Sequence, residues 1–516
     1  MNAPPPFLPR RPIYLLVFAA GFASLGVELA ASRLLDPWFG NSILVWAALI
    51  GLILLYLAVG YWLGGRWADR SPRPLIFFTL AAMAGLLVGL IPPLSQPVLR
   101  LSADVFVSYD VALLAGSFVA TLLLFSPAVV LLGCISPFAI RLLIEDSRAA
   151  GRTAGRVFAL STLGSLAGVF IPTLLLIPNL GTRRTFFSLA LMVLGLATLA
   201  LWPIARRRAL VFGLAWFALL ALALLPPGRI RADAATLYET ESAHNYIRVV
   251  RNGPEMVLKL NEGAGVHSVY NPQAGLSDGI WDYFLLAPYF APAPVQPRQV
   301  QSLLMLGLAA GTVPRLYTAA YGPIAIDGVE LDPAIIAAGQ RFFGMSEPNL
   351  RPIAQDGRFF LRTAAGRYDV IAIDAYRPPY IPFHLTTVEF FSQAREHLNP
   401  GGVVAVNVAR TGEDDSLVDA LAATLAAVFP AVFIIDEPAP PAVLGNSLVV
   451  ATVQPATLDD FLANTASLPE PMLAEVARRA RPHVRLAPTG GPLLSDDRAP
   501  IEQIIHGIVL RYLASP

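Results

Sequence analysis

Apolar segments long enough to cross a bilayer fill the chain before about residue 229, and they limit what it can fold into. A transmembrane helix needs about 20 consecutive apolar residues. We count seven such segments, at about residues 13–34, 43–64, 74–92, 109–140, 156–178, 184–203 and 209–226. The 516-residue chain is 55% hydrophobic and only 14% charged, which is too apolar for one soluble globule. The sequence therefore predicts an N-terminal α-helical transmembrane bundle.

Arginines between these segments bear on the orientation of the bundle. Short cytoplasmic loops carry an excess of basic residues. If the N-terminus lies inside, most of the loop arginines also lie inside. Seven complete spans would then leave the C-terminal part outside. The sequence leaves four explanations open: one segment does not cross, the long fourth segment crosses twice, a crossing near 92–109 is missed, or the C-terminal part is external.

Three features of the apolar part carry further expectations. The run after Arg10 and Arg11 is longer than a signal-peptide core and no cleavage-like site follows, so we expect a retained first span. Cys134 is the only cysteine, which excludes an internal disulfide, and we interpret it as a core residue. Glu28 and Arg33 flank the end of the first segment. An acid at membrane depth is a functional candidate, although a structural role for Glu28 is the simpler interpretation.

The composition changes after the turn signal Pro226–Pro227–Gly228. Segments 246–250 and 256–260 flank Asn252–Gly253, which is typical of a β-hairpin. Farther on, apolar runs alternate with helix-length segments, as in a doubly wound parallel sheet. These runs are 303–306, 324–329, 370–373, 403–408, 432–435 and 448–452. We therefore expect a transmembrane domain at 1–228, a β-hairpin region leading into the catalytic domain at 229–300, and a Rossmann-like, class I methyltransferase-like α/β domain at 301–516.

A βαβ unit from Gln301 to Asp332 carries the first binding signal of the α/β domain. A turn with Gly307 and Gly311 follows its first strand, and Glu330 ends its second strand. Such a turn lets a ligand approach the backbone, and the acid can bind two ribose hydroxyls. Ala309 stands where a middle glycine would complete the fingerprint, so an ordinary tight turn also fits the pattern.

Acids follow three of the expected strands. Glu330 and Asp332 follow one strand, Asp356 with Gly357 follows another, and Asp374 follows the run at 370–373. Ligands of open α/β sheets bind beyond the carboxyl ends of the strands. The pattern therefore predicts a functional cluster of acids in one crevice.

These stretches resemble the spermidine synthase (polyamine aminopropyltransferase) family, in particular its members fused to an N-terminal membrane domain. The resemblance rests on LKLNEGAGVHSVY (258–270), LGLAAGTVPR (306–315), GVELDP (328–333), QDGRFFL (355–361), YDVIAIDAY (368–376) and LLSDDRAPIE (493–502), and on GVELAASRLLDPWFG (26–40) and GYWLGGRWADR (60–70) in the apolar part. The family transfers an aminopropyl group from decarboxylated S-adenosylmethionine to an amine.

The resemblance implies a role for each candidate residue. Asp374 matches the acid that accepts the proton of the attacking amine. Glu330 would hold the ribose hydroxyls of the donor, and Asp356 and Gly357 would contact its adenine. His267 lies near the place of a glutamine that touches the nucleoside in the family. The other donor-site candidates are Gly307, Gly311 and Asp332, and the acceptor-site candidates are Asp282, Tyr376 and Arg377.

The chain departs from the family at the amine site. Ala310 replaces an acid of the glycine turn, and Arg377 replaces a second acid after Asp374. The family's Tyr-His-Glu falls on 280–282, where only the acid, Asp282, survives. An arginine repels a polyamine and suits a carboxylate or phosphate; alternatively, Arg377 points away or pairs with Asp374.

We therefore expect a membrane-bound, spermidine-synthase-like alkyl transferase that uses decarboxylated S-adenosylmethionine or S-adenosylmethionine, with Asp374 as base, no metal and an acceptor other than ordinary putrescine. One alternative is an S-adenosylmethionine-dependent methyltransferase or another sulfonium-processing enzyme. Another is a transporter or sensor with a nucleoside-binding domain. The net charge of +1 and the lack of a basic tract argue against nucleic acid. We expect the protein to lie in the bacterial inner (cell) membrane, with its catalytic domain in the cytoplasm. Its expected partners are the lipid bilayer and a small-molecule acceptor, and a homodimer is compatible with the sequence.

Overall fold

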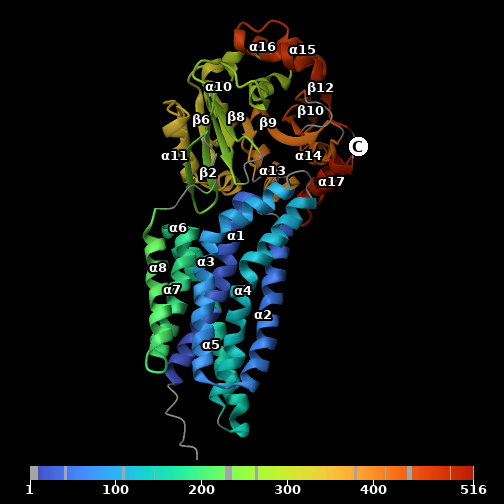
Figure 1. Cartoon of the computed structure of the whole chain (residues 1–516). Coiled ribbons are helices and arrows are strands. Elements are labelled where there is room, and N and C mark those ends of the chain that lie inside the picture. The colour runs from blue at the N-terminus through green and yellow to red at the C-terminus, as the bar shows by residue number, and fades with distance from the viewer. Residues whose placement is uncertain are drawn as a thin grey trace, which may run out of the picture. The chain divides into compact units, whose positions relative to one another are not determined.

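The computed structural model describes residues 10–39, 43–106, 111–144, 146–226, 230, 235–261, 265–376, 381–412, 414–438, 444–488 and 490–514. The chain divides into two compact units, Met1–Ala232 and Asp233–Pro516. Figure 1 shows long helices in the first unit and a sheet covered by helices in the second.

Long apolar helices form the first unit. They are α1 (Arg10–Phe39), α2 (Ile43–Arg70), α3 (Pro74–Phe106), α4 (Val111–Leu143), α5 (Ala150–Ile171), α7 (Thr182–Leu201) and α8 (Arg206–Leu224), with a short 3₁₀ turn at Ser147–Ala149. A π-helical turn, η2 (Pro172–Leu176), and α6 (Ile177–Leu180) continue α5. Seven helical segments of the described residues are long and apolar enough to cross a membrane. The long fourth segment is a single helix despite Pro127 and Pro137.

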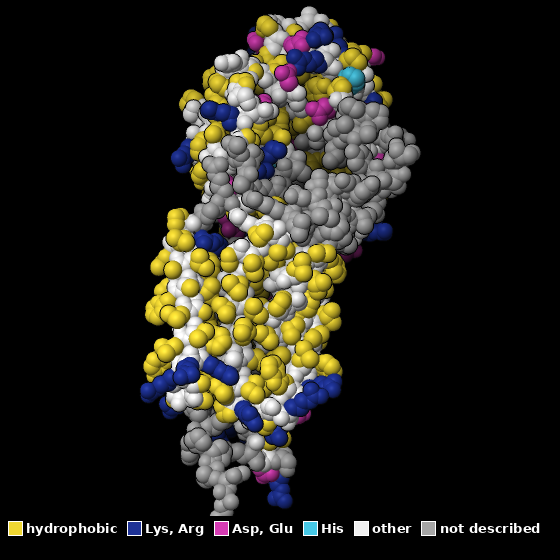
Figure 2. All heavy atoms as spheres, in the orientation of Figure 1, with side chains coloured by type: hydrophobic (Ala, Val, Ile, Leu, Met, Phe, Trp, Pro, Cys, Tyr) yellow, Lys and Arg dark blue, Asp and Glu magenta, His cyan; other side chains and the backbone are white. Residues whose placement is uncertain are grey.

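The outer surface of the helical unit is apolar. Figure 2 shows hydrophobic side chains over most of the visible face of this unit and basic side chains gathered toward one end. Exposed large side chains include Leu54 of α2, Leu174 of η2 and Leu214 of α8. A soluble monomer rarely exposes so large a contiguous apolar surface, so the surface is of the kind that suits contact with lipid.

Helix α1 packs against α5 at backbone contact distance. A Cβ atom at Gly164 of α5 would lie 2.1 Å from the carbonyl oxygen of Phe18, and one at Gly21 of α1 would lie 2.2 Å from that of Ser161. Small residues of this kind let helices approach closely in lipid, where no hydrophobic effect drives them together. Glycine at these two positions therefore sets the distance between the helices.

We expect Gly164→Ala to destabilise the helical unit by about 1–3 kcal/mol, because the added methyl group would push α1 and α5 apart. The matched control is Gly155→Ala on the same helix, where no atom lies within 4 Å of the added carbon. Thermal unfolding of the full chain in detergent measures both variants. Equal melting temperatures for the two variants would contradict the close packing.

The second unit begins with a small antiparallel sheet. Its strands are β1 (Thr236–Glu241), β2 (Tyr246–Asn252), β3 (Glu255–Leu260) and β4 (Ser268–Tyr270), in that order across the sheet. The pairing of Asn252 with Glu255 closes the β2–β3 hairpin, as the Asn-Gly pair predicted. Helix α9 (Ile280–Tyr283) and the 3₁₀ segments η3 (Phe284–Phe290) and η4 (Pro297–Gln299) lead to the large sheet.

The large sheet has eight strands in the order β12-β10-β11-β9-β8-β5-β6-β7. They are β5 (Ser302–Leu306), β6 (Ala325–Glu330), β7 (Leu350–Ala354), β8 (Tyr368–Ile373), β9 (Leu398–Thr411), β10 (Ala431–Asp436), β11 (Leu444–Thr452) and β12 (Val484–Leu486). Strands β5 to β9 pair in parallel. Strand β11 is antiparallel to both β9 and β10, so the sheet is mixed rather than wholly parallel as the sequence suggested.

Helices cover both faces of this sheet. They are α10 (Thr312–Tyr321), α11 (Pro333–Phe342), α12 (Gly357–Thr363), α13 (Val388–Glu396), α14 (Ser416–Ala426), α15 (Leu458–Thr465), α16 (Pro471–Ala480) and α17 (Ile501–Ala514), with 3₁₀ turns at Phe383–Leu385 and Arg481–His483. Successive strand residues alternate between two cores: Leu304 and Leu306 belong to one, and Leu303 and Met305 to the other. This alternation follows from the two-residue period of a strand.

Candidate active site

The site is built at the point where the strand order of the large sheet reverses. Strand β5 lies between β6 and β8, and the chain runs outward from β5 to β7 before it returns to β8. Ligands of doubly wound sheets bind at such a switch point, beyond the carboxyl ends of the strands. The backbone N–H of Asp374 donates to the carbonyl of Leu306 at 2.9 Å, which joins the ends of β8 and β5.

The turn after β5 has the backbone shape that the glycines predicted. Gly307 and Gly311 have φ angles of +87° and +86°. A Cβ atom at Gly307 would lie 2.3 Å from the carbonyl oxygen of Asp374, and so only glycine fits there. Ala309 also has a positive φ of 47°, although it carries a side chain. Its N–H thereby points to Glu330 and donates to Oε2 at 2.9 Å.

Glu330 ends β6 beside this turn, as expected. Its other carboxylate oxygen, Oε1, accepts from the N–H of Asp332 at 3.2 Å. Burial raises the pKa of Glu330 to about 7, against the opposing effect of these backbone donors. Each oxygen keeps lone-pair capacity for a further donor, so the carboxylate fits the vicinal hydroxyls of a ribose.

Asp332 lies in a different environment from Glu330. Its side chain is fully buried and caps helix α11 by accepting from the N–H of Ala334. Ser242 and Asn245, in the turn between β1 and β2 of the small sheet, also donate to it. The structure therefore places Asp332 as a link between the two sheets, not as an open ligand for a nucleoside.

The remaining predicted donor-site residues lie at two helix or strand ends. Asp356 caps α12 through Phe359, and its Oδ2 lies 3.2 Å from Nε2 of His384. Gly357 opens the same helix, where an added Cβ would meet only ordinary contacts, 3.5 Å at the closest. His267 precedes β4; burial lowers its pKa to about 4, so its ring is neutral. In the described part of the chain, its buried Nε2 has no hydrogen-bond partner.

Two side chains donate hydrogen bonds to the carboxylate of Asp374. The indole N–H of Trp281 donates to Oδ2 at 2.8 Å, and the amide of Asn407 donates to Oδ1 at 2.9 Å. Burial raises the pKa of Asp374, while both hydrogen bonds stabilise the ionised form and lower it. The outcome is a carboxylate that is fixed in place and has a greater affinity for a proton than an exposed aspartate.

Sequence reasoning missed Trp281 and Asn407 as partners of Asp374. Asn407 lies on β9 near its carboxyl end, so the same strand-end rule that found Asp374 would have found it. The oxygen Oδ1 of Asn407 is buried and, among the described residues, accepts no hydrogen bond. Trp281 reaches the site from α9, far earlier in the chain, and no local pattern marks it.

The predicted acceptor-site residues are engaged by the protein where the structure describes them. Asp282 is 2% exposed and accepts from Ser277 and from the N–H of Asp278. The hydroxyl of Tyr376 donates to the carbonyl of Asn407, 3.1 Å away. Arg377 lies outside the described residues. Asp282 thus stabilises the turn before α9, and Tyr376 ties the end of β8 to β9.

A further acid stands at the same edge of the sheet. Strand β10 runs in the direction of β9, because antiparallel β11 lies between them, so Glu437 follows a carboxyl end at this edge. A Cβ atom at Gly279 would lie 3.5 Å from the Trp281 ring and 3.9 Å from Oε1 of Glu437. Burial raises the pKa of Glu437. It was not among the sequence candidates.

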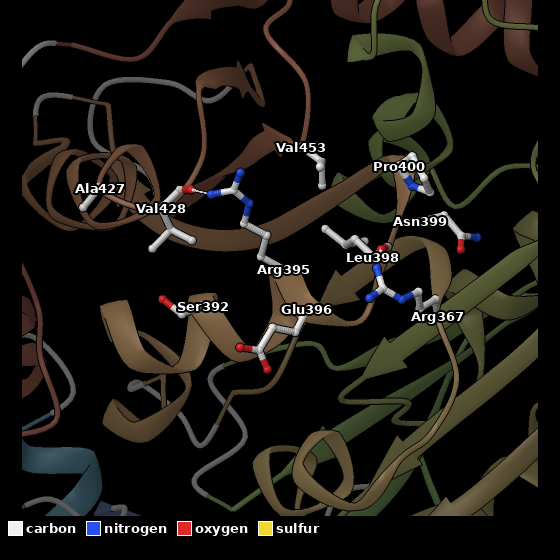
Figure 3. A pocket seen from close by; sticks show the side chains of 10 residues that line it. All are labelled: Arg367, Ser392, Arg395, Glu396, Leu398, Asn399, Pro400, Ala427, Val428 and Val453. Carbon is white, nitrogen blue, oxygen red and sulfur yellow. Dashed lines mark hydrogen bonds between the residues drawn. The ribbon is translucent and has the colours of Figure 1, made fainter.

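A cavity of about 510 Å³ lies elsewhere, at the amino ends of β8 and β9. Figure 3 shows Arg395 in its wall, with a guanidinium that donates to the carbonyl of Val428 at 2.6 Å. The guanidinium of Arg367 also donates to a backbone carbonyl, that of Leu398. This cavity is at the opposite edge from Glu330 and Asp374 and does not belong to the site.

Comparisons with known proteins found relatives that cover part of the chain. The "Probable polyamine aminopropyl transferase" of Bifidobacterium longum is 38% identical over 194 residues, 37% of this chain. The chain is a relative of the polyamine aminopropyltransferases. It spans 42% of the length of that relative, and 44% of the length of a polyamine aminopropyltransferase of Vibrio vulnificus, which is 32% identical over 133 residues.

One relative extends into the helical unit. "Polyamine aminopropyltransferase 2" of Ralstonia nicotianae is 26% identical over 423 residues, 76% of this chain and 78% of the relative. Among solved structures, a probable spermidine synthase from Corynebacterium glutamicum aligns with a TM-score of 0.40 and 18% identity, over 52% of this chain and 97% of that one. No family model matches the chain.

Several features of the site suit a nucleoside. Glu330 can accept two hydroxyls, and the glycine turn allows close approach. Nε2 of His267 is buried and has no partner among the residues that the structure describes. Within the described residues, no group of three or more His, Cys, Asp or Glu side chains is placed to hold a metal ion. The residues at this edge can therefore hold a nucleoside and a proton acceptor together.

We expect the affinity for methylthioadenosine to rise as the pH rises through about 7, because the ionised carboxylate of Glu330 accepts hydroxyl donors better than the neutral acid. Glu330→Ala should weaken binding by about 1–3 kcal/mol. Glu330→Gln is the control, since its affinity should not follow this pH dependence. Calorimetry across the pH range measures all three. Unchanged affinity in the alanine variant would remove Glu330 from the site.

Proposed function

We propose that the chain is an alkyl transferase that moves an aminopropyl group from decarboxylated S-adenosylmethionine to an amine, with Asp374 as general base. The carboxylate held by Trp281 and Asn407 next to the glycine turn carries this proposal. The similarity to polyamine aminopropyltransferases supports it.

In this reaction, Asp374 takes a proton from the ammonium group of the acceptor. The neutral nitrogen then attacks the propyl carbon next to the sulfonium; the new C–N bond forms as the C–S bond breaks, and methylthioadenosine leaves. An ammonium ion is not a nucleophile, so a nearby carboxylate with increased proton affinity accelerates the step. The sulfonium loses its charge during transfer, so the acid belongs near the amine rather than the sulfur.

The acceptor proposed here is an amine other than ordinary putrescine. The resemblance to the spermidine synthase family implies acids at the places of Ala310 and Arg377, and Ala310 is only 1% exposed. Among the described residues, Asp282 and Glu437 are acids close to Trp281, and Asp282 is already engaged by Ser277 and Asp278. With acids missing from two of the family's places, the acceptor side favours an amine with fewer positive charges, or with a different spacing between them.

The altered acceptor side also favours a second candidate, an S-adenosylmethionine-dependent methyltransferase or another sulfonium-processing enzyme on the same scaffold. A transporter or sensor whose soluble unit binds a nucleoside is the non-enzymatic alternative, because seven long apolar helices exceed what an anchor needs. The donor that the chain uses distinguishes the aminopropyltransferase from the methyltransferase. Detectable turnover distinguishes either enzyme from a transporter or sensor.

The proposed function predicts product formation from decarboxylated S-adenosylmethionine and an amine panel, and loss of turnover in Asp374→Asn. The asparagine keeps the shape of the side chain but cannot accept the proton. Mass spectrometry of the products, with S-adenosylmethionine as the second donor, is the measurement. Methyl transfer alone would favour the methyltransferase, and donor binding without any turnover would favour the sensor.

For Trp281→Phe, we expect the acidic limb of the pH–rate profile to move to higher pH. Loss of the indole N–H removes a bond that stabilises the ionised base, so the pKa of Asp374 rises and less of it is deprotonated at low pH. Trp216→Phe is the matched control, because that indole donates to the carbonyl of Leu191 in the helical unit. A profile that does not move would show that Trp281 does not tune the base.

Putrescine should be a poor acceptor for the wild-type chain and a better one for Arg377→Asp. Two like charges about 4 Å apart cost roughly 4 kcal/mol at an effective dielectric near 20, or about a thousandfold in affinity. Adding Ala310→Asp should increase activity with putrescine less than the family pattern suggests. Residue 310 is buried, so a carboxylate there would be poorly solvated. The kcat/KM for putrescine is measured in detergent. Efficient wild-type turnover at micromolar putrescine would contradict the prediction.

We further propose that the helical unit lies in the inner (cell) membrane of a bacterium and that the catalytic unit is cytoplasmic, since the donor is made in the cytosol. Contact with the bilayer, and a homodimer, are compatible with this arrangement. A reporter that functions only in the cytoplasm should be active when it is fused to the C-terminus. Activity of a reporter that works only in the periplasm would place the catalytic unit outside.

A further inference from the structure

The cavity at the amino edge of the large sheet is separate from the candidate active site. Strands β8, β9 and β10 begin at this edge, and antiparallel β11 ends there. The cavity, of about 510 Å³, lies between these strand ends and the last turn of α13, and the structure describes all of its lining residues. Sites for small molecules are typically concave and of this size. The cavity therefore has room for a ligand of its own.

The backbone holds two arginine side chains in the wall of the cavity. Arg395, in the last turn of α13, donates to the carbonyl of Val428 at 2.6 Å, and its guanidinium lies 5.9 Å from the centre of the Phe429 ring. Arg367, just before β8, donates to the carbonyl of Leu398 at 3.0 Å. A guanidinium carries five N–H donors, so each of the two keeps donors for a ligand.

No carboxylate neutralises these two arginines within the described part of the chain. Arg367 and Arg395 form no ion pair there. Other arginines of the second unit do, such as Arg358 with Asp496, where a nitrogen and an oxygen lie 2.7 Å apart. A guanidinium that is held in place and unpaired suits a carboxylate, which it can bind through two parallel N–H groups.

Glu396 is the one acid among the lining residues, and it follows Arg395 at the end of α13. Consecutive residues of a helix do not face each other. Figure 3 shows the carboxylate of Glu396 turned away from the guanidinium of Arg395. Across the described residues, Glu396 takes part in no hydrogen bond or ion pair. The cavity thus presents positive groups and, apart from them, one negative group.

Aliphatic side chains make up most of the remaining wall. They are Leu398, Pro400, Ala427, Val428 and Val453. Leu398 is 1% exposed and belongs to one of the two cores of the sheet, so the packing of the sheet fixes this part of the wall. Such a surface suits a short hydrocarbon chain.

We propose that this cavity binds a small aliphatic amino acid. Arg367 and Arg395 bind its carboxylate, Glu396 binds its ammonium group, and the aliphatic wall contacts its hydrocarbon chain. A simple anion matches the lining less well, because Glu396 repels it, whereas an amino acid complements both signs of charge. The inference concerns the amino edge of the sheet and does not depend on the proposed transfer activity.

Equilibrium dialysis of the full chain in detergent against tritiated L-leucine tests the proposal. Two competitors keep the leucine skeleton and lack one charge each: 4-methylpentanoate has no ammonium group, and 3-methylbutylamine has no carboxylate. We expect saturable binding that unlabelled leucine displaces at about tenfold lower concentration than either competitor, because each competitor loses a charge-assisted hydrogen bond. Absence of saturable binding, or displacement by 4-methylpentanoate or inorganic phosphate as effective as that by leucine, would overturn the proposal.

Two substitutions locate the binding site. Arg367→Gln and Arg395→Gln should each weaken leucine binding about tenfold, since each removes a charged donor to the carboxylate. The matched control is Arg362→Gln, which changes an exposed arginine of α12 that does not line the cavity, and its affinity for leucine should equal that of the wild type. An equal loss in the control, or full affinity in both cavity variants, would place the leucine elsewhere.

Glu396→Gln distinguishes an amino acid site from a simple anion site. Glutamine keeps the size of the side chain, and Glu396 makes no hydrogen bond or ion pair to the described residues that the fold would lose. We expect this variant to bind leucine about tenfold more weakly and 4-methylpentanoate more tightly, because both the attraction for the ammonium group and the repulsion of the carboxylate disappear. Wild-type affinity for leucine, or an equal loss for both ligands, would contradict the role of Glu396 and overturn the proposal.

Discussion

The second unit depends on one close approach between two backbones. The turn after β5 touches the backbone of Asp374 so closely that Gly307 has no room for a Cβ atom, 2.3 Å from the carbonyl oxygen. Because β5 and β8 are neighbours in the sheet, this contact ties the glycine turn, which we propose faces the nucleoside, to Asp374, the proposed base. A side chain at Gly307 would separate them, and it would do so without changing either functional group.

Burial acts on both carboxylates of the site, but their partners differ. Glu330 is held by backbone N–H groups of the turn and by its own strand end, so its position follows from the sheet. Asp374 is held by side chains from two other segments, α9 and β9. The partners of Asp374 can be changed by single substitutions, so Trp281 and Asn407 are the residues that tune its affinity for a proton.

The sequence was informative where one local rule decides the structure. Buried parallel strands require continuous apolar runs, and each expected run in the α/β part is a strand. The direction of β11 could not be predicted, because an apolar run is the same in either direction. Asp332 followed a strand end just as Glu330 did, yet it caps a helix and joins the small sheet, and nothing in the order of residues distinguishes the two roles. Trp281 was missed because its partner, Asp374, lies 93 residues away.

The antiparallel strand β11 has a consequence for how the two halves of the site can change. Strands β5 to β7 and their turns carry the glycine turn and Glu330, while α9 and β9 supply the partners of Asp374. The hairpin of β10 and β11 brings Glu437 to the same edge as Asp374 without any connection through the glycine turn. If the proposed function holds, replacements around β9, β10 and α9 can accumulate during evolution while the glycine turn and Glu330 stay intact, so a new acceptor specificity need not compromise recognition of the donor.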